Sequence, residues 1–462
     1  MYLIMDISKG KTLDRREKKP WLRNPRFLLA LIIAIALAVY FLDVRPRIAP
    51  VGASQVELIA IGVLLLALAI VVLIFLGTLI IALAVAAWTR TWEPVRSWLL
   101  RMRGEMIYIL TFTLLLGVIV LVSQWMAYTP PILGDDGKPL PNSIASLEKV
   151  RLGGVNQWLI IRGQSVEKPV LLFLSGGPGG SDAGRVLRFN QELEKHFVVV
   201  IWEQRGCGKS YFSIGTDPNM SVDRYVSDIT ELSETLRIRF HQDKIYLMGH
   251  SSGSIFGIKA IQQRPDLFYA YIGSGQMVNL KETGKTIYKM LLDNAEKTGD
   301  VKYSEELKDL GEPPYSGSNS ILKYMKVNGR VYGIFEEPYI KSERFRKERG
   351  LTELVLIPEY GWLDRVGWFL GQMNTFNKVI PQLQEFDFRK DALDLNVPVY
   401  FMLGRHDIRS NYWLAEDYFK KLQAPSKKLF MFEDSGHDMI WQETDKFHAI
   451  MVNTILPETY QP

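Results

Sequence analysis

The sequence Gly249-His250-Ser251-Ser252-Gly253 stands between a strand-like run of apolar residues and a helix-like run. In this setting the pattern glycine–X–serine–X–glycine predicts a sharp turn from strand to helix, which lifts the serine hydroxyl out of the sheet. Such a turn has a strained backbone and leaves room only for small residues two positions to either side of the serine. A chance glycine–serine turn is the alternative, but the flanking strand and helix favour Ser251 as a nucleophile.

A nucleophilic serine needs a histidine base and a carboxylate that orients the histidine. Asp407 follows one late strand-like run, and His437 lies in a glycine turn that follows the next one. The chain order serine, acid, histidine is the order of the α/β-hydrolases. His406 is the alternative base, but it directly precedes Asp407 and would break this order. We therefore predict that His437 takes the proton of Ser251 and later gives it to the leaving group.

An acyl-transfer site also needs two backbone N–H groups that bind the oxyanion of the intermediate. One is expected from Ser252, the residue after the nucleophile. The other is expected from the loop Ser-Gly-Gly-Pro-Gly-Gly at 175–180, which follows a buried strand-like run. Gly177 is the preferred donor and Gly176 is the alternative. A phosphate cradle is a different interpretation of this loop, but its spacing does not match the dinucleotide pattern G-x-G-x-x-G.

A second glycine-containing loop, residues 203–210, ends in Gly-Lys-Ser like a phosphate-binding loop. Such a loop has a glycine five positions before that ending, and this chain has Glu203 there. Nucleotide binding is therefore not predicted. No cluster of metal-ligating residues stands out in the sequence, so we expect neither a metal ion nor an organic cofactor.

Three sequences together carry a family resemblance: Gly-Gly-Pro-Gly-Gly at 176–180, Glu-Gln-Arg-Gly-Cys-Gly-Lys-Ser at 203–210 and Gly-His-Ser-Ser-Gly at 249–253. With them the chain resembles the proline iminopeptidase family of α/β-hydrolases over roughly residues 145 to 456. The resemblance implies a serine peptidase that removes an N-terminal residue, often proline, beneath a helical cap. It also implies the triad of Ser251, Asp407 and His437, with the first glycine loop in the oxyanion hole.

The sequence departs from this family at two places. The family's first glycine loop usually opens with histidine, and this chain has Ser175 there. The family's cap usually carries a Trp-Ser-x-Trp-Glu stretch whose acid helps to hold the substrate amine, and the nearest aromatic stretch here is 360–368. The resemblance therefore predicts the peptidase fold and triad, and leaves the preference for proline open.

The chain after residue 128 divides into segments that differ in composition. Residues 129–145 form a polar, turn-rich linker, and we predict an α/β-hydrolase core at 146–280 and 395–462 with a helical cap at 281–394 between the two halves. Four acidic residues of the cap are candidates for binding a substrate ammonium: Glu336, Glu337, Glu359 and Asp364. The alternative for each of them is a solvated surface carboxylate.

The first 128 residues contain three uncharged apolar runs, near 27–42, 58–88 and 106–128. About 20 apolar residues span a hydrocarbon core of about 30 Å, so the second run is long enough to require tilting or kinking. A buried core helix is the alternative for a single run, but the second run is too long for one. We therefore predict a membrane anchor of three spans.

The basic residues of this region predict its orientation. Eight precede the first span: Lys9, Lys11, Arg15, Arg16, Lys18, Lys19, Arg23 and Arg26. Four lie between the second and third spans: Arg90, Arg96, Arg101 and Arg103. Only two, Arg45 and Arg47, lie between the first and second spans. Because positive residues stay on the cytoplasmic side, the N-terminus is expected inside and the catalytic domain outside the cell. If the first run were a cleaved signal, the two remaining spans would still leave the catalytic domain outside the cell.

The charge of the chain agrees with a membrane anchor. Residues 1–128 carry 14 Lys and Arg against 7 Asp and Glu, a net charge of +7, so the whole-chain value of +5 leaves −2 for the rest. The excess of positive charge therefore belongs to the anchor, and nucleic-acid binding is not predicted. The single cysteine, Cys207, excludes an internal disulfide.

These observations together predict a membrane-anchored serine hydrolase with lipids around its N-terminal spans. The favoured activity is that of an aminopeptidase, which cleaves N-terminal residues from short peptides through an acyl-enzyme. The first alternative is a carboxylesterase or lipase that uses the same triad on small esters. The second is a non-catalytic sensor or scaffold, against which an intact triad argues.

Overall fold

A computed structural model of the protein describes residues 25–48, 50–90, 93–214, 220–315, 317 and 319–460. The chain forms two compact units, Met1–Glu57 and Leu58–Pro462. The described part of the first unit contains α1 (Pro25–Val39), a π-helical turn, α2 (Arg45–Arg47) and the start of α3 (Pro50–Thr89). A buried ion pair between Arg45 Nε and Glu57 Oε1, 2.7 Å apart, connects α2 to the first turns of α3.

Two of the three predicted spans correspond to long apolar helices. By length and composition, Gly52–Thr89 in α3 and Val95–Trp125 in α4 (Glu93–Trp125) could each cross a membrane, with mean hydropathies of 3.4 and 2.5. The first predicted span falls largely on α1, which has only 15 residues, and the shorter apolar stretch Ile32–Val44 continues it. The structure therefore supports two long apolar helices, and it does not show a third of that length among the described residues.

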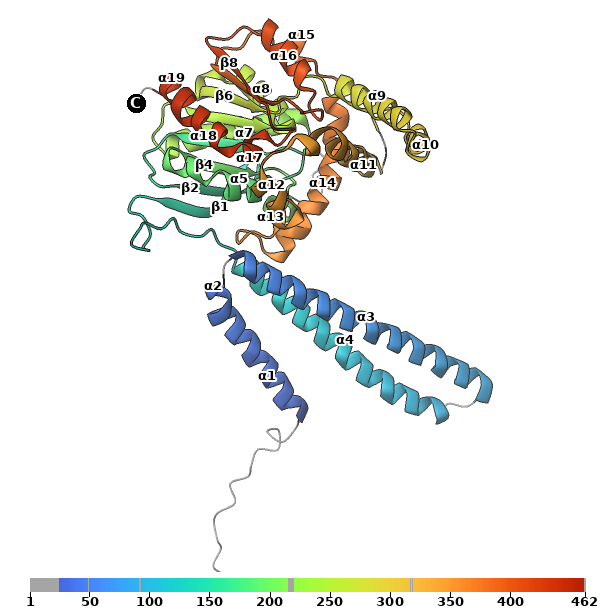
Figure 1. Cartoon of the computed structure of the whole chain (residues 1–462). Coiled ribbons are helices and arrows are strands. Elements are labelled where there is room, and N and C mark those ends of the chain that lie inside the picture. The colour runs from blue at the N-terminus through green and yellow to red at the C-terminus, as the bar shows by residue number, and fades with distance from the viewer. Residues whose placement is uncertain are drawn as a thin grey trace, which may run out of the picture. The chain divides into compact units, whose positions relative to one another are not determined.

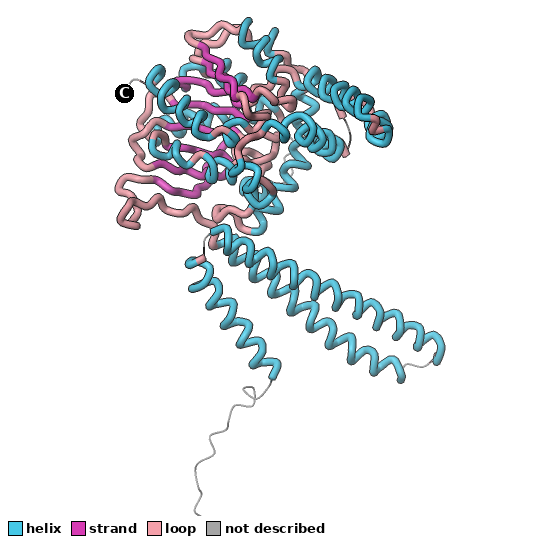
Figure 2. The backbone as a smooth tube through the Cα atoms, in the orientation of Figure 1, coloured by secondary structure: helices cyan, strands magenta, loops and turns pink. Residues whose placement is uncertain are grey.

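The second unit is built on an eight-stranded mixed sheet, drawn in magenta in Figure 2. Its strands are β1 (Ile144–Leu152), β2 (Val155–Gly163), β3 (Val170–Leu174), β4 (Val198–Glu203), β5 (Ile245–His250), β6 (Phe268–Ser274), β7 (Val399–Gly404) and β8 (Lys427–Phe432). Their order across the sheet is β1-β2-β4-β3-β5-β6-β7-β8. β2 runs antiparallel to both of its neighbours, and the strands from β4 to β8 are parallel. The carboxyl ends of the parallel strands therefore meet at one edge, where loops can build a site.

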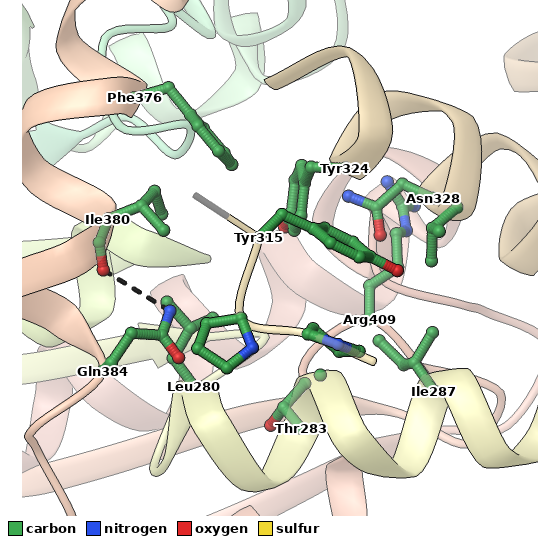
Figure 3. A pocket seen from close by; sticks show the side chains of 14 residues that line it. Leu280, Thr283, Ile287, Tyr315, Tyr324, Asn328, Phe376, Ile380, Gln384 and Arg409 are labelled. Carbon is green, nitrogen blue, oxygen red and sulfur yellow. Dashed lines mark hydrogen bonds between the residues drawn. The ribbon is translucent and has the colours of Figure 1, made fainter. Parts of the chain in front are cut away.

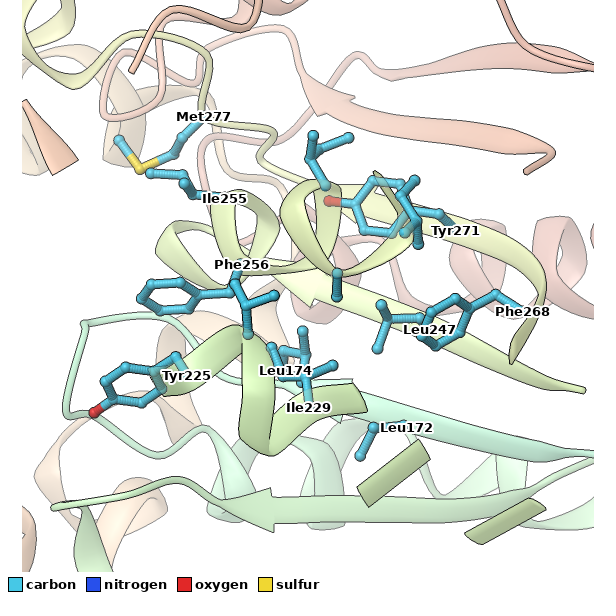
Figure 4. Close-up of a cluster of buried hydrophobic side chains, with 14 of the residues drawn as sticks. Leu172, Leu174, Tyr225, Ile229, Leu247, Ile255, Phe256, Phe268, Tyr271 and Met277 are labelled. Atoms are coloured by element: carbon cyan, nitrogen blue, oxygen red, sulfur yellow. The ribbon is translucent and has the colours of Figure 1, made fainter. Parts of the chain in front are cut away.

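Helices cover both faces of this sheet (Figure 1). They are α5 (Ala183–Phe189), α6 (Tyr211–Ile214), α7 (Val222–Arg239), α8 (Ser252–Gln263), α15 (Phe388–Asp391), α16 (Tyr412–Lys421), α17 (Met439–Gln442), α18 (Thr444–Ile450) and α19 (Leu456–Thr459). Alternate residues of β3 belong to different cores: Leu172 and Leu174 pack with α7 and α8, and Leu171 and Phe173 pack with α5 and α18. Figure 4 shows part of the first core. Burial on both faces explains why the central strands are continuous apolar runs.

A helical insertion separates β6 from β7 and occupies most of the stretch predicted as the cap. Its helices are α9 (Leu280–Thr298), α10 (Val301–Leu310), α11 (Ser320–Val331), α12 (Glu343–Glu348), α13 (Leu351–Val355) and α14 (Trp362–Leu383). The side chain of Asn279 accepts the N–H of Glu282 and caps the start of α9. Ile287, Leu291 and Leu307 form a small apolar core that joins α9 to α10.

Candidate active site

Ser251 forms the turn between β5 and α8, as the sequence predicts. Its φ of 54° and ψ of −125° lie outside the usual regions for a residue with a side chain. An added Cβ at Gly253 would lie 2.4 Å from the carbonyl oxygen of Leu174, and one at Gly249 would lie 2.6 Å from the carbonyl oxygen of Gly253. The turn therefore requires glycine at both positions. The Ser251 N–H donates to the carbonyl of Ser274 at 2.9 Å, which anchors the turn to β6.

Asp407 and His437 follow β7 and β8, and the structure brings their side chains together. His437 Nδ1 lies 2.9 Å from Asp407 Oδ2. The backbone N–H of Ser410 donates to Asp407 Oδ1 at 2.9 Å, and the Ser410 hydroxyl donates to Oδ2. Burial alone would raise the pKa of Asp407, but His437 and Ser410 outweigh burial and lower it below its ordinary value. The alternative base, His406, stacks on Tyr339 with ring centroids 3.8 Å apart, away from this pair.

The predicted oxyanion donors lie beside Ser251. Ser252 is the first residue of α8, so its N–H has no acceptor within the helix. Gly176 and Gly177 line the same cavity as Ser251. Gly176 donates its N–H to Asp182 Oδ2 at 2.9 Å. Because this N–H already has an acceptor, Gly177 is favoured over Gly176 as the second oxyanion donor.

Ser251 and His437 face a cavity of about 430 Å³ between the loops at the strand ends and the cap. The loops contribute a rim of glycines together with most of the charged groups: Gly176, Gly177, Gly180, Ser181, Asp182, Arg185, His250, Arg409, His437 and Asp438. The cap contributes chiefly apolar and aromatic residues: Ile321, Tyr324, Met325, Asn328, Gly329, Tyr332, Arg349, Leu354, Trp368, Gln372 and Phe376. A cavity of this size accommodates a small ligand.

A buried carboxylate, Asp438, directly follows His437 in the chain. Asp438 Oδ1 is 3.1 Å from Arg185 Nη1, and Asp438 Oδ2 is 2.9 Å from Arg409 Nη2. Burial would raise the pKa of Asp438, but Arg409 and Arg185 hold it well below its ordinary value. His250 Nε2 lies 3.9 Å from the same carboxylate, and burial lowers the pKa of His250 well below its ordinary value. These pKa shifts favour the charged form of Asp438 and the neutral form of His250.

Comparisons with known proteins place this site in a family. A profile of the family described as "Serine aminopeptidase, S33" matches residues 167–327. A protein described as a probable aminopeptidase, from Bacillus subtilis (strain 168), is 31% identical over 309 residues, which cover 67% of this chain and 96% of that protein. The chain belongs to the serine aminopeptidase S33 family. It is therefore a hydrolase, and this membership agrees with the predicted α/β-hydrolase fold.

Two further proteins are similar to this S33 family member. A proline iminopeptidase from Saccharolobus solfataricus is 24% identical over 315 residues, which cover 65% of this chain and 89% of the relative. The solved structure of a proline iminopeptidase-related protein from Thermus thermophilus has a TM-score of 0.47 and is 21% identical. The match covers 68% of this chain and 98% of the Thermus thermophilus protein.

The cap carboxylates that the sequence suggested as amine ligands of this S33 enzyme lie elsewhere. None of the four belongs to the described residues that line the cavity. Glu336 is buried against Arg409, with Oε2 2.8 Å from Nη2, and also accepts the backbone N–H of His437 at 3.2 Å. Glu337 is exposed, and Asp364 is buried with its Oδ2 2.6 Å from Lys209 Nζ. Glu359 is also buried, and burial raises its pKa to about 7.

Two other carboxylates line the cavity of the S33 enzyme, and the sequence analysis missed both. Asp182 follows the first glycine loop, and Asp438 directly follows His437. Their positions next to two recognised site motifs were the signal that could have identified them. Burial raises the pKa of Asp182, and the neighbouring Arg185 opposes that effect.

A small side pocket of about 50 Å³ adjoins the main cavity of this S33 enzyme (Figure 3). It shares Tyr324, Asn328, Phe376 and Arg409 with the main cavity, and Leu280 and Ile287 add apolar walls. The buried hydroxyls of Thr283 and Tyr315 at this pocket have no hydrogen-bond partner in the structure. Across the described ranges no group of three or more metal-ligating side chains comes together.

Proposed function

We propose that the protein is a membrane-anchored serine aminopeptidase that removes N-terminal residues from short peptides. The observation that carries this proposal is the 2.9 Å contact between His437 Nδ1 and Asp407 Oδ2, in a site where Ser251 occupies a strained turn beside the same cavity. Acyl transfer requires a nucleophile, a base and an acid that orients the base, and this contact supports His437 and Asp407 as the base and the acid beside Ser251. Membership in the S33 family supports the same reaction class.

The proposed reaction has two steps. His437 Nε2 takes the proton of the Ser251 hydroxyl as Oγ attacks the scissile carbonyl, and the imidazolium then gives that proton to the leaving amine. The N–H groups of Gly177 and Ser252 hold the oxyanion of each tetrahedral intermediate. In the second step a water molecule loses a proton to His437 and attacks the acyl-enzyme, which releases the amino acid and restores Ser251.

An aminopeptidase also needs a group that recognises the substrate ammonium, and Asp182 is the proposed group. Its carboxylate lines the cavity next to Gly176 and uses Oδ2 to accept that residue's N–H at 2.9 Å. Burial penalises its charged form, so a bound ammonium would offset part of this penalty. Asp438 contributes a second negative charge, although Arg185 and Arg409 already hold it.

An esterase is the second candidate, and one specific observation favours it. The described cap residues on the cavity wall include no carboxylate and several apolar side chains, among them Ile321, Met325 and Phe376. Such a wall suits an uncharged acyl or alcohol group. The peptidase proposal therefore depends on the carboxylates Asp182 and Asp438 of the core, and the esterase proposal depends on the apolar side chains that the cap contributes to the cavity wall.

Three substrates separate the two activities: an aminoacyl-coumarin amide, its N-acetylated counterpart and a short-chain nitrophenyl ester. For the peptidase we expect turnover of the free-amine amide, much weaker turnover of the N-acetylated amide, and loss of both in Ser251→Ala. Ester cleavage alone would favour the esterase. A fluorophosphonate should label the wild type and leave Ser251→Ala unlabelled, and failure to label the wild type would contradict both proposals.

Membrane anchoring with the N-terminus inside and the catalytic domain outside the cell is also a proposal. The lengths and compositions of α3 and α4 support anchoring, and the basic residues that flank them support the orientation. Protease protection in intact spheroplasts tests it with a tag at the N-terminus. If only α3 and α4 cross the bilayer, the tag and the catalytic domain will be cleaved from the same side.

A further inference from the structure

The cap helix α14 exposes an apolar face. Leu363, Val366, Leu370 and Met373 follow one another at intervals of three and four residues, which places them on one side of the helix. The opposite side is also apolar, because Trp368 and Val379 lie there and are buried in the unit. A helix on the surface of a soluble domain normally buries one such stripe and exposes polar residues on the other, so the exposed stripe of α14 requires a partner.

Helices that contact α14 also carry exposed apolar side chains. Asn374 of α14 donates to the hydroxyl of Tyr211 in α6 at 2.7 Å, and Ser320 of α11 donates to Asn377 at 2.6 Å, so α6 and α11 pack beside α14. Both carry exposed apolar side chains. We define the cap apolar face by eight residues that are between 36% and 56% exposed: Phe212, Leu322, Met325, Leu363, Val366, Phe369, Leu370 and Met373.

The start of α14 is attached to the end of the long apolar helix α4. Gln124 Nε2 donates to Asp364 Oδ1 at 2.8 Å, and the backbone N–H of Trp362 donates to Ser123 Oγ at 3.3 Å. Trp125 at this end of α4 is 83% exposed. Exposed tryptophan at the end of an apolar helix is typical of the membrane–water interface. The start of α14, which carries Leu363 and Val366 of the cap apolar face, therefore lies where the proposed membrane helix α4 ends, and Figure 1 shows these two helix ends side by side.

We propose that the cap apolar face lies on the lipid bilayer, with its side chains among the headgroups and upper acyl chains. This inference rests on the proposed anchoring by α3 and α4. Continuity with α4 favours lipid over a second copy of the chain as the partner. Charge favours it as well, because α11 carries Lys323 and Arg330 and no acidic residue, and basic residues beside an apolar face are typical of interfacial helices. The third basic residue of α11, Lys326, pairs with Glu306 of α10 at 2.9 Å.

The proposal connects the bilayer to the catalytic cavity. Met325 belongs both to the cap apolar face and to the cavity lining. Trp368, Gln372 and Phe376 line the cavity from α14 itself. The cap apolar face and the catalytic cavity therefore share Met325, and α14 borders both of them. The substrate class that fits this arrangement is an amphiphilic peptide or acyl compound with an apolar tail.

A single introduced cysteine tests the contact, because the only native cysteine, Cys207, is buried. The full-length variants Leu370→Cys and Met373→Cys would carry an environment-sensitive fluorophore in nanodiscs of phosphatidylcholine and phosphatidylglycerol, with or without nitroxide-labelled lipid. Glu167→Cys, exposed in the loop that precedes β3, is the aqueous control. Leu114→Cys, exposed on α4, is the membrane control.

We expect the nitroxide lipid to quench the fluorophores at 370, 373 and 114 strongly and the fluorophore at 167 weakly. Quenching at 114 without quenching at 370 and 373 would overturn the inference and leave the anchor intact. Absence of quenching at 114 would refute the anchor, and the inference would fall with it. Disulfide-linked dimers of Leu370→Cys in unlabelled nanodiscs, without lipid quenching, would replace the bilayer with a second copy as the partner.

Discussion

His437 Nδ1 lies 2.9 Å from Asp407 Oδ2 and 3.0 Å from Oδ1, so one ring nitrogen faces both oxygens of the carboxylate. This contact holds the tautomer in which Nε2 can accept the serine proton. We expect Asp407→Asn to lower kcat on an aminoacyl-coumarin amide by about 10⁴-fold, because the amide favours the wrong tautomer. Asp434→Asn, which removes the partner of Lys341, is the matched control. Equal activity in the two variants would refute the assigned role.

The pH dependence of activity should report the pKa of His437. Burial lowers this pKa, but the charge and hydrogen bond of Asp407 outweigh burial and raise it above the ordinary value of about 6.5. The base acts only when it is neutral, so kcat/KM should rise with pH through a pKa above about 6.5. The residual activity of Asp407→Asn should show this rise at a lower pH. A rise in the wild type centred well below about 6.5 would argue against His437 as the base.

Gly176 leaves no room for a side chain against the nucleophile. An added Cβ would lie 2.9 Å from Ser251 Cβ, so Gly176→Ala must displace one of the two loops. We expect kcat to fall by about 10²-fold, because a displacement of about 1 Å disrupts alignment with the substrate. Gly333→Ala adds a methyl group where nothing lies within 4 Å and is the control. Unchanged kcat in Gly176→Ala would show that the loop is not part of the oxyanion site.

Asp182→Asn should separate recognition of the amine from catalysis. The asparagine carbonyl can still accept the N–H of Gly176, so the loop keeps its shape and loses only the charge. We expect KM for the free-amine amide to rise by about 10- to 100-fold, the value of a charged hydrogen bond, and KM for the nitrophenyl ester to stay unchanged. Equal effects on both substrates would exclude Asp182 as the ammonium ligand.

The buried Glu359 makes stability depend on pH. Burial raises its pKa from an ordinary 4.5 to about 7, so the folded state holds the proton more tightly than the unfolded state does. Its stabilising contribution is complete below about pH 4.5 and is lost as pH rises through about 7, a change of at most about 3 kcal/mol. Glu359→Gln should therefore raise the melting temperature in detergent at pH 8 more than at pH 5. The opposite order would contradict a neutral buried carboxyl.

The positions of Ser251, Asp407 and His437 at one edge of the sheet could be predicted from the sequence because local rules decide them. Gly249 and Gly253 are required by collisions within the turn itself, and each triad residue follows its own strand. The strand order then brings these loops to one edge of the sheet. Pattern and chain order were enough to find these residues, since neither depends on how distant side chains pair.

The amine-binding acids could not be predicted in the same way. Glu336 and Asp364 looked available in the sequence, but Arg409 and Lys209, which are far away in the chain, hold them by ion pairs. Which carboxylate faces a cavity depends on such long-range pairing and on burial, and local sequence does not encode either. The same holds for the exposed stripe of α14, because apolar spacing alone does not say which side of a helix is covered.

The order of the strands along the chain has a consequence for biosynthesis. Ser251 is made before the cap, whereas Asp407 and His437 come after it, in the loops that follow β7 and β8. A chain that ends before residue 437 therefore has the proposed nucleophile without the proposed base, and we expect at most residual hydrolysis from it. Full activity requires synthesis past residue 437.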